Sequence, residues 1–401
     1  MGTEQTQFRH PSQFAAIRSA LVPFALFALT APCLAAPQNP SQQERLKGLT
    51  LEQLGNIEVT TVSKVPVSAS RTPAAVYVIT QEDIRRSGAT SLPEALRLAP
   101  GVEVARIDGV KWAIGIRGFQ SRLSRNLLVL IDGRTVYSPL FHGVYWEVQE
   151  TLMEDIERIE VIRGPGGTIW GANAVNGVIN VITKDSRETK GTLLSAKAGT
   201  VDQAALDARE GGGTGNFNYR IYAKAFVRGP EFHSDHRQFD DFRRAQGGFR
   251  ADWKADSKND LTIQGDIYDG RDGESAQLTR ISPPSSYVLD QNGKLSGGNL
   301  MAHWTRDLGK GSEIQVQTYY DRVRRLQPNQ RESRDTFDVD FVHRWALGDR
   351  QNITWGAGIR FSVGDIPPVV PTQVFSPAHR TDQLASGFVQ HETKLVPDKL
   401  S

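Results

Sequence analysis

The pattern of hydrophobic and polar positions changes near Lys184. From Arg71 to Lys184, short apolar runs alternate with helix signals, which predicts a mixed domain of strands and helices. After Lys184, apolar and polar residues alternate with a period of two, which predicts antiparallel strands with one apolar and one polar face. The chain therefore divides into two parts of different architecture.

The first part contains short β-branched runs and two helix starts. One helix begins after Thr80, where Asp83 completes a capping box, and ends at Gly88. A second has Pro93 in its first turn and ends at Pro100-Gly101. Strands are predicted at residues 75–79, 102–105, 113–116, 127–131, 156–162 and 177–182.

The second part shows the alternation most clearly in YRIYAKAFVR, where Ile221 and Val227 share one face and Arg220 and Lys224 the other. We expect ten strands from Gly191 onward, with long connections at residues 229–244, 270–297 and 364–382 and short connections between them. Long loops on one side are typical of a barrel that spans an outer membrane. A soluble β-sandwich is the alternative, but the polar face is too charged for a packed core. Aromatic residues expected as girdles near strand ends are Trp253, Tyr268, Trp304, Tyr320, Trp345 and Phe361.

The N-terminal residues have the pattern of a secretory signal peptide. Arg9 and Arg18 precede an apolar stretch at residues 20–34, which ends in Ala35-Ala36. We assign residues 1–35 to the signal peptide, with a core helix as the alternative, and residues 36–70 to a polar periplasmic tail. Cleavage would remove Cys33, the single cysteine, so the mature chain can hold neither a disulfide framework nor a cysteine-based zinc site.

Composition excludes several classes of protein. The 401 residues carry 47 Lys and Arg against 45 Asp and Glu, so no charge surplus suits nucleic acid. Mean hydropathy is -0.39, and no apolar run after the first forty residues approaches the roughly 18 residues of a transmembrane helix. A helical membrane protein is therefore excluded, and a soluble enzyme, a repeat protein or a β-barrel remains.

The most specific motif is IERIEVIRGPGGTIWGANAVNGVINVITK at residues 156–184. A strand ends at Arg163, a glycine-rich turn follows, and Gly171 and Gly177 bracket a loop of small residues before the next strand. A phosphate-binding loop is the competing interpretation, but the segment lacks the Lys-Ser/Thr step and a following helix.

This motif, with AIGIRGF, LLVLIDGRTVY and VYVITQEDIRRSGATSLPEALRLAPGV, resembles the plug domain of TonB-dependent outer-membrane receptors over about 110 residues. The resemblance implies an α+β plug domain at residues 71–184, then antiparallel transmembrane β-strands at residues 188–401 that form about ten strands of a 22-stranded outer-membrane barrel. Plug positions that carry the motif are Arg117, Gly118, Arg163, Gly164, Pro165, Gly171, Gly177 and Asn180.

The resemblance also implies a function. Receptors of this family take up an iron–siderophore complex or a similar bulky chelate across the outer membrane, with energy supplied through TonB, and they are not enzymes. Cobalamin is the alternative ligand. The rival function is a non-transporting truncated receptor, a sensor or an inactive remnant. We expect outer-membrane lipid as a partner, and neither a cofactor, a resident metal nor nucleic acid.

Members of the family carry a short TonB box before the plug. Our candidate is the extended β-branched segment that could add to a sheet edge through its main chain, comprising Ile57, Glu58, Val59, Thr60, Thr61 and Val62. The alternative is that this segment is the first strand of the plug.

Ligand contacts are expected from amphipathic rings that follow the turn at Asp132-Gly133. The candidates are Tyr137, Phe141, His142, Tyr145 and Trp146. The alternative is that these rings pack against the barrel wall. Arg117 and Arg163 are expected to pair with acidic residues of the wall, since a plug inside a barrel must be held by polar groups.

Two clusters resemble metal sites only weakly. His233 and His236 flank Asp235 in a predicted loop, and Asp269, Asp272 and Glu274 lack the spacing of a calcium loop. We therefore predict no metal site.

Size constrains the barrel. Ten strands enclose a backbone diameter of roughly 20 Å and twenty-two strands roughly 44 Å. A plug of about 110 residues has a diameter of roughly 34 Å. Ten strands cannot enclose it, so we predict an open, curved sheet beside the plug.

Overall fold

The computed structural model describes residues 58–59, 61, 67–68, 74–171, 173–283, 285–348, 350–370 and 374–395. These residues all belong to one compact unit, Thr50–Ser401, and the predicted signal peptide lies outside them. Across the described ranges, no helix is long and apolar enough to cross a membrane.

The plug is built on a five-stranded sheet in the order β3 (Val76–Thr80), β8 (Ile156–Ile162), β9 (Gly177–Thr183), β6 (Leu127–Ile131) and β7 (Arg134–Thr135). β6 and β9 are parallel and the other neighbours are antiparallel. A second sheet pairs β4 (Val102–Arg106) with β5 (Trp112–Ile116), and a third pairs β1 (Glu58–Val59) with β2 (Val67–Ser68). The strands predicted for this part are confirmed.

The plug helices are short. Helix α3 (Gln81–Ser87) has the predicted capping box between Thr80 and Asp83, and Gly88 ends it at φ 72° in the left-handed region. Helix α4 (Leu92–Ala95) has only one turn before the 3₁₀ turn η2 (Leu96–Leu98). The predicted second helix is therefore shorter than expected, because Ala99 precedes a proline and takes an extended conformation. The remaining turns are η3 (Trp146–Val148), η4 (Met153–Asp155), α5 (Gly167–Trp170) and η5 (Ser186–Thr189).

The plug has its own hydrophobic core. All five residues of β5 and all five of β6 are buried, as is most of β9. Ile84 of α3 and Leu92 of α4 pack into the same cluster as Ile114, Ile159 and Ile179. Because this core is built from plug residues alone, the plug presents a formed surface to the second part of the chain.

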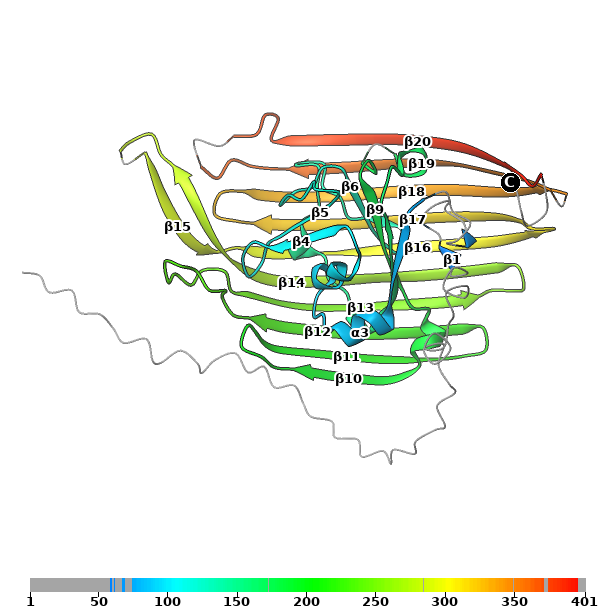
Figure 1. Ribbon diagram of the computed structural model, residues 1–401, viewed down its shortest axis with the longest axis horizontal. Coiled ribbons are helices and arrows are strands. Elements are labelled where there is room, and N and C mark those ends of the chain that lie inside the picture. The colour runs from blue at the N-terminus through cyan, green and yellow to red at the C-terminus, as the bar shows by residue number, and fades with distance from the viewer. Residues whose placement is uncertain are drawn as a thin grey trace, which may run out of the picture. The chain divides into compact units, whose positions relative to one another are not determined.

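The second part is a single antiparallel sheet, which we call the wall sheet (Figure 1). Its order is β10 to β14, then β16 to β20, with β15 paired to β14 alone. Among the described strands, none bridges β10 to β20, so the sheet is open as predicted. The strands are β10 (Gly191–Lys197), β11 (Asp202–Thr214), β12 (Phe217–Arg228), β13 (Phe242–Lys254), β14 (Asn259–Thr279), β15 (Ser286–Asn292), β16 (Lys294–Gly309), β17 (Ser312–Leu326), β18 (Arg331–Leu347), β19 (Gln351–Asp365) and β20 (His379–Thr393).

Two predictions about the wall sheet are wrong in detail. The predicted long connection at residues 270–297 is mostly strand, because β14 continues to Thr279 and forms a hairpin with β15, at the left of Figure 1. The sheet thus has eleven strands rather than ten. The glycines at 211–213 lie within β11, where the absence of a Cβ lets the carbonyl group of Thr189 approach Gly211.

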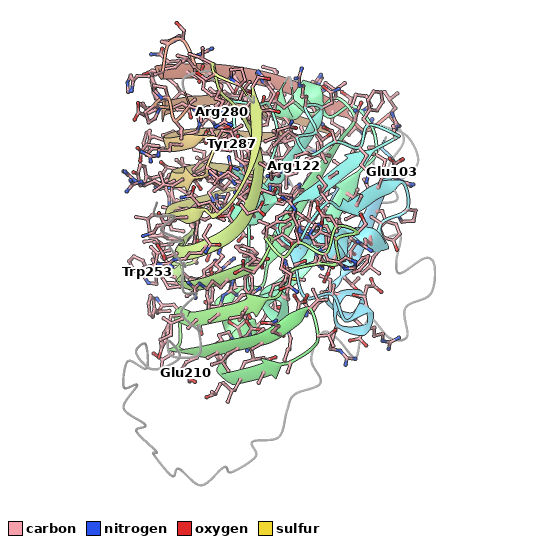
Figure 2. The ribbon with its side chains drawn as sticks, turned by 90° about the vertical axis from the view of Figure 1, so that its left-hand side faces the viewer. Glu103, Arg122, Glu210, Trp253, Arg280 and Tyr287 are labelled. Atoms are coloured by element: carbon pink, nitrogen blue, oxygen red, sulfur yellow. The ribbon has the colours of Figure 1, made fainter. Side chains whose placement is uncertain are left out.

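The predicted two-faced alternation is confirmed. Arg220 and Lys224 of β12 are buried against the plug, whereas Ile221 and Val227 are exposed on the far face. Figure 2 shows Trp253 on the side of the sheet away from Arg122 and Glu103 of the plug. Tyr268, expected in a girdle, instead faces the plug and is buried, because it packs with Tyr145 and Val148.

Candidate functional site

The plug is held to the wall sheet by buried charges. Asp155 of η4 forms ion pairs with both Arg209 and Arg220, which project from neighbouring wall strands. Lys224 Nζ lies 2.8 Å from Glu150 Oε2 of the plug and donates to the carbonyl of Thr151 at 3.0 Å. Such pairs are retained where both partners are hydrogen-bonded, because either charge alone would be costly to bury. The expectation that polar groups hold the plug to the wall is met by these residues.

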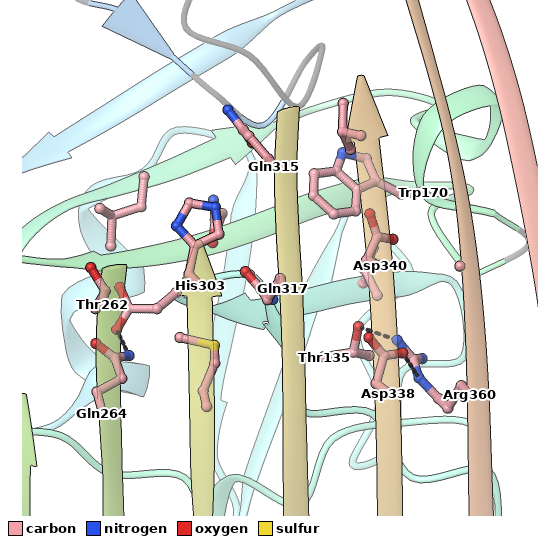
Figure 3. Close-up of a pocket in the computed structure, with 18 of the residues that line it drawn as sticks. Thr135, Trp170, Thr262, Gln264, His303, Gln315, Gln317, Asp338, Asp340 and Arg360 are labelled. Atoms are coloured by element: carbon pink, nitrogen blue, oxygen red, sulfur yellow. Dashed lines mark hydrogen bonds and ion pairs between the residues drawn. The ribbon is translucent and has the colours of Figure 1, made fainter. Parts of the chain in front are cut away.

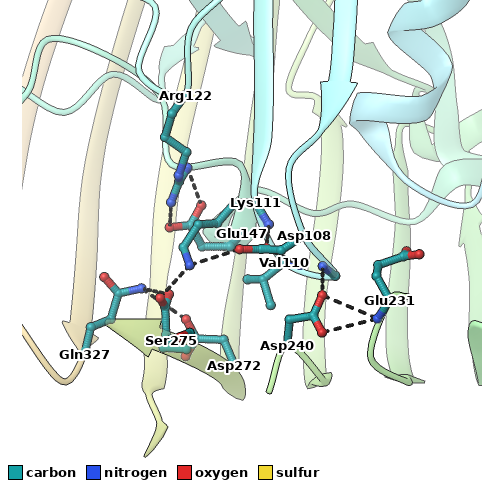
Figure 4. Close-up of polar contacts among 12 residues, drawn as sticks. Asp108, Val110, Lys111, Arg122, Glu147, Glu231, Asp240, Asp272, Ser275 and Gln327 are labelled. Atoms are coloured by element: carbon teal, nitrogen blue, oxygen red, sulfur yellow. Dashed lines mark hydrogen bonds and ion pairs between the residues drawn. The ribbon is translucent and has the colours of Figure 1, made fainter. Parts of the chain in front are cut away.

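Glu147 is the centre of a second group of contacts between the plug and the wall sheet (Figure 4). Its carboxylate lies 2.9 Å from Arg122 of the plug and 2.9 Å from Arg325 of β17. Burial opposes ionisation, but the two guanidinium groups outweigh it and lower the pKa of Glu147 to about 2. The Arg325 guanidinium also lies 3.6 Å from the centre of the Tyr145 ring. One plug carboxylate is therefore shared between plug and wall.

A plug loop at Asp108–Lys111 makes a further contact with the wall sheet. Asp108 accepts from the N–H groups of Val110 and Lys111 at 2.9 and 2.6 Å, which fixes the loop. Lys111 Nζ then bridges Asp108 at 3.2 Å and Glu274 of β14 at 2.5 Å. Although Lys111 is largely buried, these two carboxylates raise its pKa above the ordinary value.

The neighbouring amide of the same loop contacts the wall as well. Gly109 N–H donates to Asp240 at 2.5 Å, and Asp240 also accepts from the N–H of Glu231 at 3.2 Å. A side chain at Gly109 would collide with the Asp240 main chain, so only glycine allows this approach. The Asp108–Lys111 loop is therefore anchored to Asp240, in the connection between β12 and β13, and to Glu274 of β14.

A cavity of about 640 Å³ separates another part of the plug from the wall sheet (Figure 3). The wall side presents His303, Gln315, Gln317 and Asp340, and the plug side includes Trp170. Arg360 of β19 crosses its edge and bonds to Asp338 at 2.8 Å and to Thr135 of the plug at 3.1 Å. The lining combines these polar groups with apolar side chains such as Leu128, Met301 and Val342, so it does not favour either a polar or an apolar solute.

The predicted ligand-binding rings fall into two groups. Trp146 lies in the plug core, and Tyr145 is buried between the plug and the wall with Phe242 and Leu295. Phe141 is half-buried and contacts Phe375 of the long connection 366–378 at 6.2 Å between ring centres. The packing alternative therefore describes the environment of Tyr145 and Trp146.

The other two rings lie at the exposed end of the same segment. Tyr137 Oη and His142 Nδ1 are 2.6 Å apart, and His142 is exposed at φ 57°. Burial raises the pKa of Tyr137 to about 12, so its phenol stays neutral at physiological pH. Ser138 N–H donates to Gly143 at 2.8 Å, which closes residues 138–143 into a loop. Tyr137, Phe141 and His142 are thus grouped at one accessible loop.

The TonB-box candidate is described at three positions, and Ile57, Thr60 and Val62 lie outside the described residues. Glu58 and Val59 pair with β2. Thr61 is buried: its N–H and hydroxyl donate to Glu160 at 3.0 and 2.5 Å, while Trp170 Nε1 donates to its carbonyl at 2.5 Å. Asn180 Nδ2 donates to the Thr61 hydroxyl at 3.1 Å. The segment is thus fastened to the plug at Thr61.

The glycine-rich motif serves the local packing of the plug. A side chain at Gly177 would collide with the Ile162 carbonyl, and Gly171 has φ 84°. Contrary to expectation, a one-turn helix, α5, follows Gly164-Pro165, because Trp170 N–H bonds back to the Gly166 carbonyl at 3.0 Å. Its single turn is too short to form a phosphate-binding helix.

The two motif arginines do not pair as predicted. Arg117 donates to the carbonyl of Arg163 at 2.9 Å, and Arg163 donates to the carbonyl of Pro100 at 3.2 Å. Both therefore bind plug main chain, not acids of the wall, because Arg117 lies at an exposed turn with φ 63°. Gly118, which follows with φ 80°, donates its N–H to Glu103 at 3.1 Å.

Sequence reasoning missed the residues that join plug to wall. Arg122, Glu147 and Lys111 lie in loops or turns without a motif. Arg325 and Glu274 could have been noticed as charges on the polar face of their strands, but their partners are far away in sequence. Within the described residues, no group of three or more His, Cys, Asp or Glu is arranged to hold a metal ion.

Known proteins are similar to the plug in sequence. Residues 68–178 match the family model of the TonB-dependent receptor plug domain. The chain is 33% identical over 150 residues to the vitamin B12 transporter BtuB of Vibrio vulnificus, and 32% identical over 153 residues to that of Vibrio cholerae. These alignments cover 37% and 38% of this chain but only 24% of each relative, so the chain spans about a quarter of the curated relatives' length.

Solved structures share the fold of plug and wall together. A mutant of the ferric enterobactin receptor PfeA from Pseudomonas aeruginosa aligns with a TM-score of 0.64 at 17% identity, covering 85% of this chain and 57% of that one. The ferric-catecholate import receptor Fiu from E. coli K12 aligns with a TM-score of 0.63 at 16% identity, covering 84% and 59%. At such identities the likeness concerns the fold alone.

Plug, wall sheet and comparisons define one class of protein. The chain contains a TonB-dependent receptor plug domain, and its plug and wall sheet together have the fold of part of such receptors, as the sequence resemblance indicated. TonB-dependent receptors reside in the outer membrane, which is the location expected from the sequence.

Proposed function

We propose that this protein is part of an outer-membrane uptake receptor. The receptor binds an iron–siderophore complex, or a similar bulky chelate, and its uptake is energised through TonB. The observation that carries the proposal is the packing of a complete plug on one face of the wall sheet through buried ion pairs such as Glu147–Arg325. A soluble β-sandwich would not line one face with charges that a separate domain neutralises.

The domain assignment follows from this proposal. Residues 1–35 would be the signal peptide, 36–70 the periplasmic tail, 71–184 the plug and 188–401 the transmembrane part. In the working receptor, further strands would close the wall sheet, because a plug of roughly 34 Å cannot be enclosed by about ten strands.

TonB is the proposed energy-transducing partner, and residues 57–62 are its proposed binding segment. Two features support this assignment. Glu58 and Val59 are already extended and paired with only one neighbouring strand, so a partner strand could add at the other edge. Thr61 is fastened by hydrogen bonds to Glu160, Trp170 and Asn180, which would break if TonB withdrew the segment.

The proposed ligand site is the exposed loop with Tyr137, Phe141 and His142. Aromatic faces and polar ring atoms together suit a chelate that has both apolar and polar edges. An iron–siderophore complex is the leading candidate. Cobalamin is the alternative, because the chain is similar to the vitamin B12 transporter BtuB.

A binding panel tests the ligand assignment. Outer membranes that contain the protein are titrated with ferric catecholate, ferric hydroxamate and cyanocobalamin, and bound ligand is compared with membranes that contain the Phe141→Ala variant. Saturable binding of a ferric chelate, weakened by Phe141→Ala, supports the proposal. Saturable binding of cyanocobalamin alone would transfer the assignment to cobalamin.

A non-transporting receptor or sensor is the second candidate. It is compatible with the ligand loop and with the plug–wall contacts, neither of which by itself requires passage of a ligand through the membrane. This candidate predicts ligand binding without accumulation in the periplasm, so an uptake assay separates the two.

A further inference from the structure

The face of the wall sheet that points away from the plug carries an unexpected row of cations. Phe242, Asp272, Leu295, Arg325 and Glu332 are buried on the plug side. Because side chains alternate along a strand, the residues next to them point outward. These neighbours are Arg243, Arg271, Lys294, Arg324 and Arg331, and all five are exposed.

Strand register brings these cations together. Arg243 of β13 lies directly opposite Arg271 of β14. On the next strands, Lys294 lies opposite Leu326, and Leu326 lies opposite Arg331. Arg324 is two residues before Leu326 on the same face. The cations therefore form a row across five neighbouring strands, β13, β14, β16, β17 and β18.

Among the residues that the structure describes, most of this charge has no ion-pair partner. Lys294 lies 3.4 Å from Asp269, and the nearby Arg322 lies 3.2 Å from Asp335. Among the described residues, no carboxylate forms an ion pair with Arg243, Arg271, Arg324 or Arg331, which we call the arginine belt. Two like charges directly opposite each other in a sheet are destabilising unless an anion lies between them.

The belt lies at a defined height on the sheet. The outward row Trp253, Leu261, Trp304, Val316 and Phe341 is in register across the same five strands. Four of these residues are ten positions from the cation on their own strand, as Trp253 is from Arg243, and Val316 is eight positions from Arg324. Ten residues extend about 34 Å, or about 26 Å along the membrane normal at a tilt of about 40°.

That separation matches the apolar band of an outer-membrane barrel, which is about 25 Å tall. Between the two rows the outward face is mostly apolar, with exposed Phe249, Ile263, Ile267, Leu300 and Phe337. Its charged residues Asp269, Arg322 and Asp335 lie beside the cationic row. If the apolar face lies in lipid, the arginine belt lies at the depth of the headgroups on the side of the long connections.

A hollow beside the belt adds a second observation. Lys294, Arg324 and Arg331 line a hollow of about 590 Å³, together with the amide side chains of Gln291 and Asn292 and the carboxylates of Glu332 and Asp365. Cations and amide donors in one concavity suit the oxygens of a phosphate group.

We propose that the arginine belt binds the phosphate groups of anionic lipid in the outer leaflet. The proposal rests on the proposed placement of the wall sheet in the outer membrane, and it concerns a surface separate from the ligand loop and the TonB-box candidate. Bidentate arginine contacts to phosphate would neutralise the Arg243–Arg271 repulsion and anchor the sheet at one height.

The test uses the full chain in nonionic detergent. Retention of diphosphoryl lipid A is compared with that of dephosphorylated lipid A, which has the same acyl chains, and with inorganic phosphate. The belt variant carries Arg243→Gln, Arg271→Gln, Arg324→Gln and Arg331→Gln. The matched control carries Lys258→Gln, Arg306→Gln, Lys310→Gln and Arg350→Gln, four exposed cations at the ends with short connections.

We expect the unaltered chain and the control to prefer diphosphoryl lipid A by at least about tenfold, and the belt variant to lose this preference, since each arginine near an anionic headgroup contributes appreciably. Equal preference in the belt variant and the unaltered chain would overturn the proposal, and so would complete displacement of the lipid by inorganic phosphate. Should the fourfold variant not fold, the pairs Arg243→Gln/Arg271→Gln and Arg324→Gln/Arg331→Gln are each expected to lose part of the preference. Lipid retention in detergent requires neither TonB nor a chelate, so its failure is distinct from a failure of uptake.

Discussion

Lys111 of the plug and Glu274 of β14 form an ion pair with 2.5 Å between Nζ and Oε2. Glu274 lies in the part of β14 that forms a hairpin with β15, so the pair links the plug to an element at the end of the sheet with long connections. Gln327 also donates to Glu274 at 2.5 Å and to Asp272 at 3.1 Å. A movement of the hairpin would therefore change the contacts of the Asp108–Lys111 loop with the wall sheet.

Removing the Lys111 ammonium should loosen the plug. Lys111→Met leaves Glu274 without its cation in a mostly buried site, and we expect a loss of about 2–3 kcal/mol in the free energy that holds the loop against the wall. Hydrogen exchange at residues 106–112 measures this loss. Lys190→Met, at an exposed position, is the control and should leave exchange unchanged. Unchanged protection in Lys111→Met would show that the pair does not hold the loop.

Glu147 should make the plug–wall contact sensitive to acid. Its pKa is lowered to about 2 in the folded protein, against an ordinary value of 4.5. A carboxyl with a depressed folded pKa stabilises the fold above its unfolded pKa, and this contribution is lost as the pH falls from about 4.5 toward 2. We therefore expect Glu147→Gln to be less stable than the unaltered chain at pH 7, with the difference shrinking below pH 4. Urea unfolding followed by tryptophan fluorescence across this range measures it, and a pH-independent difference would contradict the account.

Thr61 should control access to the TonB-box candidate. Thr61→Val removes the hydroxyl that donates to Glu160 and accepts from Asn180. The loss of about 1–2 kcal/mol should raise the population of the released segment roughly 5- to 30-fold. Limited proteolysis between residues 57 and 67 reports this population. Thr192→Val, on exposed β10, is the control, and equal cleavage of the two variants would argue against fastening at Thr61.

The rings at residues 137–146 should separate into ligand-binding and structural positions. Phe141→Ala should weaken chelate binding while thermal stability falls little, because Phe141 is only half-buried. Trp146→Ala should destabilise the plug by about 3–5 kcal/mol, because Trp146 is buried in the core. Paired binding isotherms and melting curves distinguish the two. Normal binding in Phe141→Ala would remove this residue from the proposed site.

Local signals in the sequence predicted much of the fold. Thr80 and Asp83 form the predicted capping box, Gly88 ends the helix, and the period of two places Arg220 and Lys224 on the plug-facing side. These features depend on neighbours within a few residues, so a single sequence reveals them. The open sheet followed from the relative sizes of plug and barrel.

Long-range contacts could not be predicted in the same way. Glu147 and Arg325 are 178 positions apart, and Lys111 and Glu274 are 163 apart. No local pattern indicates which charge on a strand meets which loop. The hairpin of β14 and β15 was missed because its alternation is short, and Tyr268 was misplaced because its proximity to a strand end outweighed its position on the plug-facing side of the alternation. Arg117 and Arg163 were assigned to the wall on the basis of charge alone.

Energy-dependent uptake tests the central claim most directly. Accumulation of radiolabelled ferric chelates and cobalamin is measured in cells whose outer membrane contains this protein as the sole receptor, with and without TonB. We predict accumulation of one of these ligands when TonB is present and only surface binding when TonB is absent. Accumulation that does not depend on TonB, or no accumulation of any of them by protein verified in the outer membrane, would contradict the proposed function.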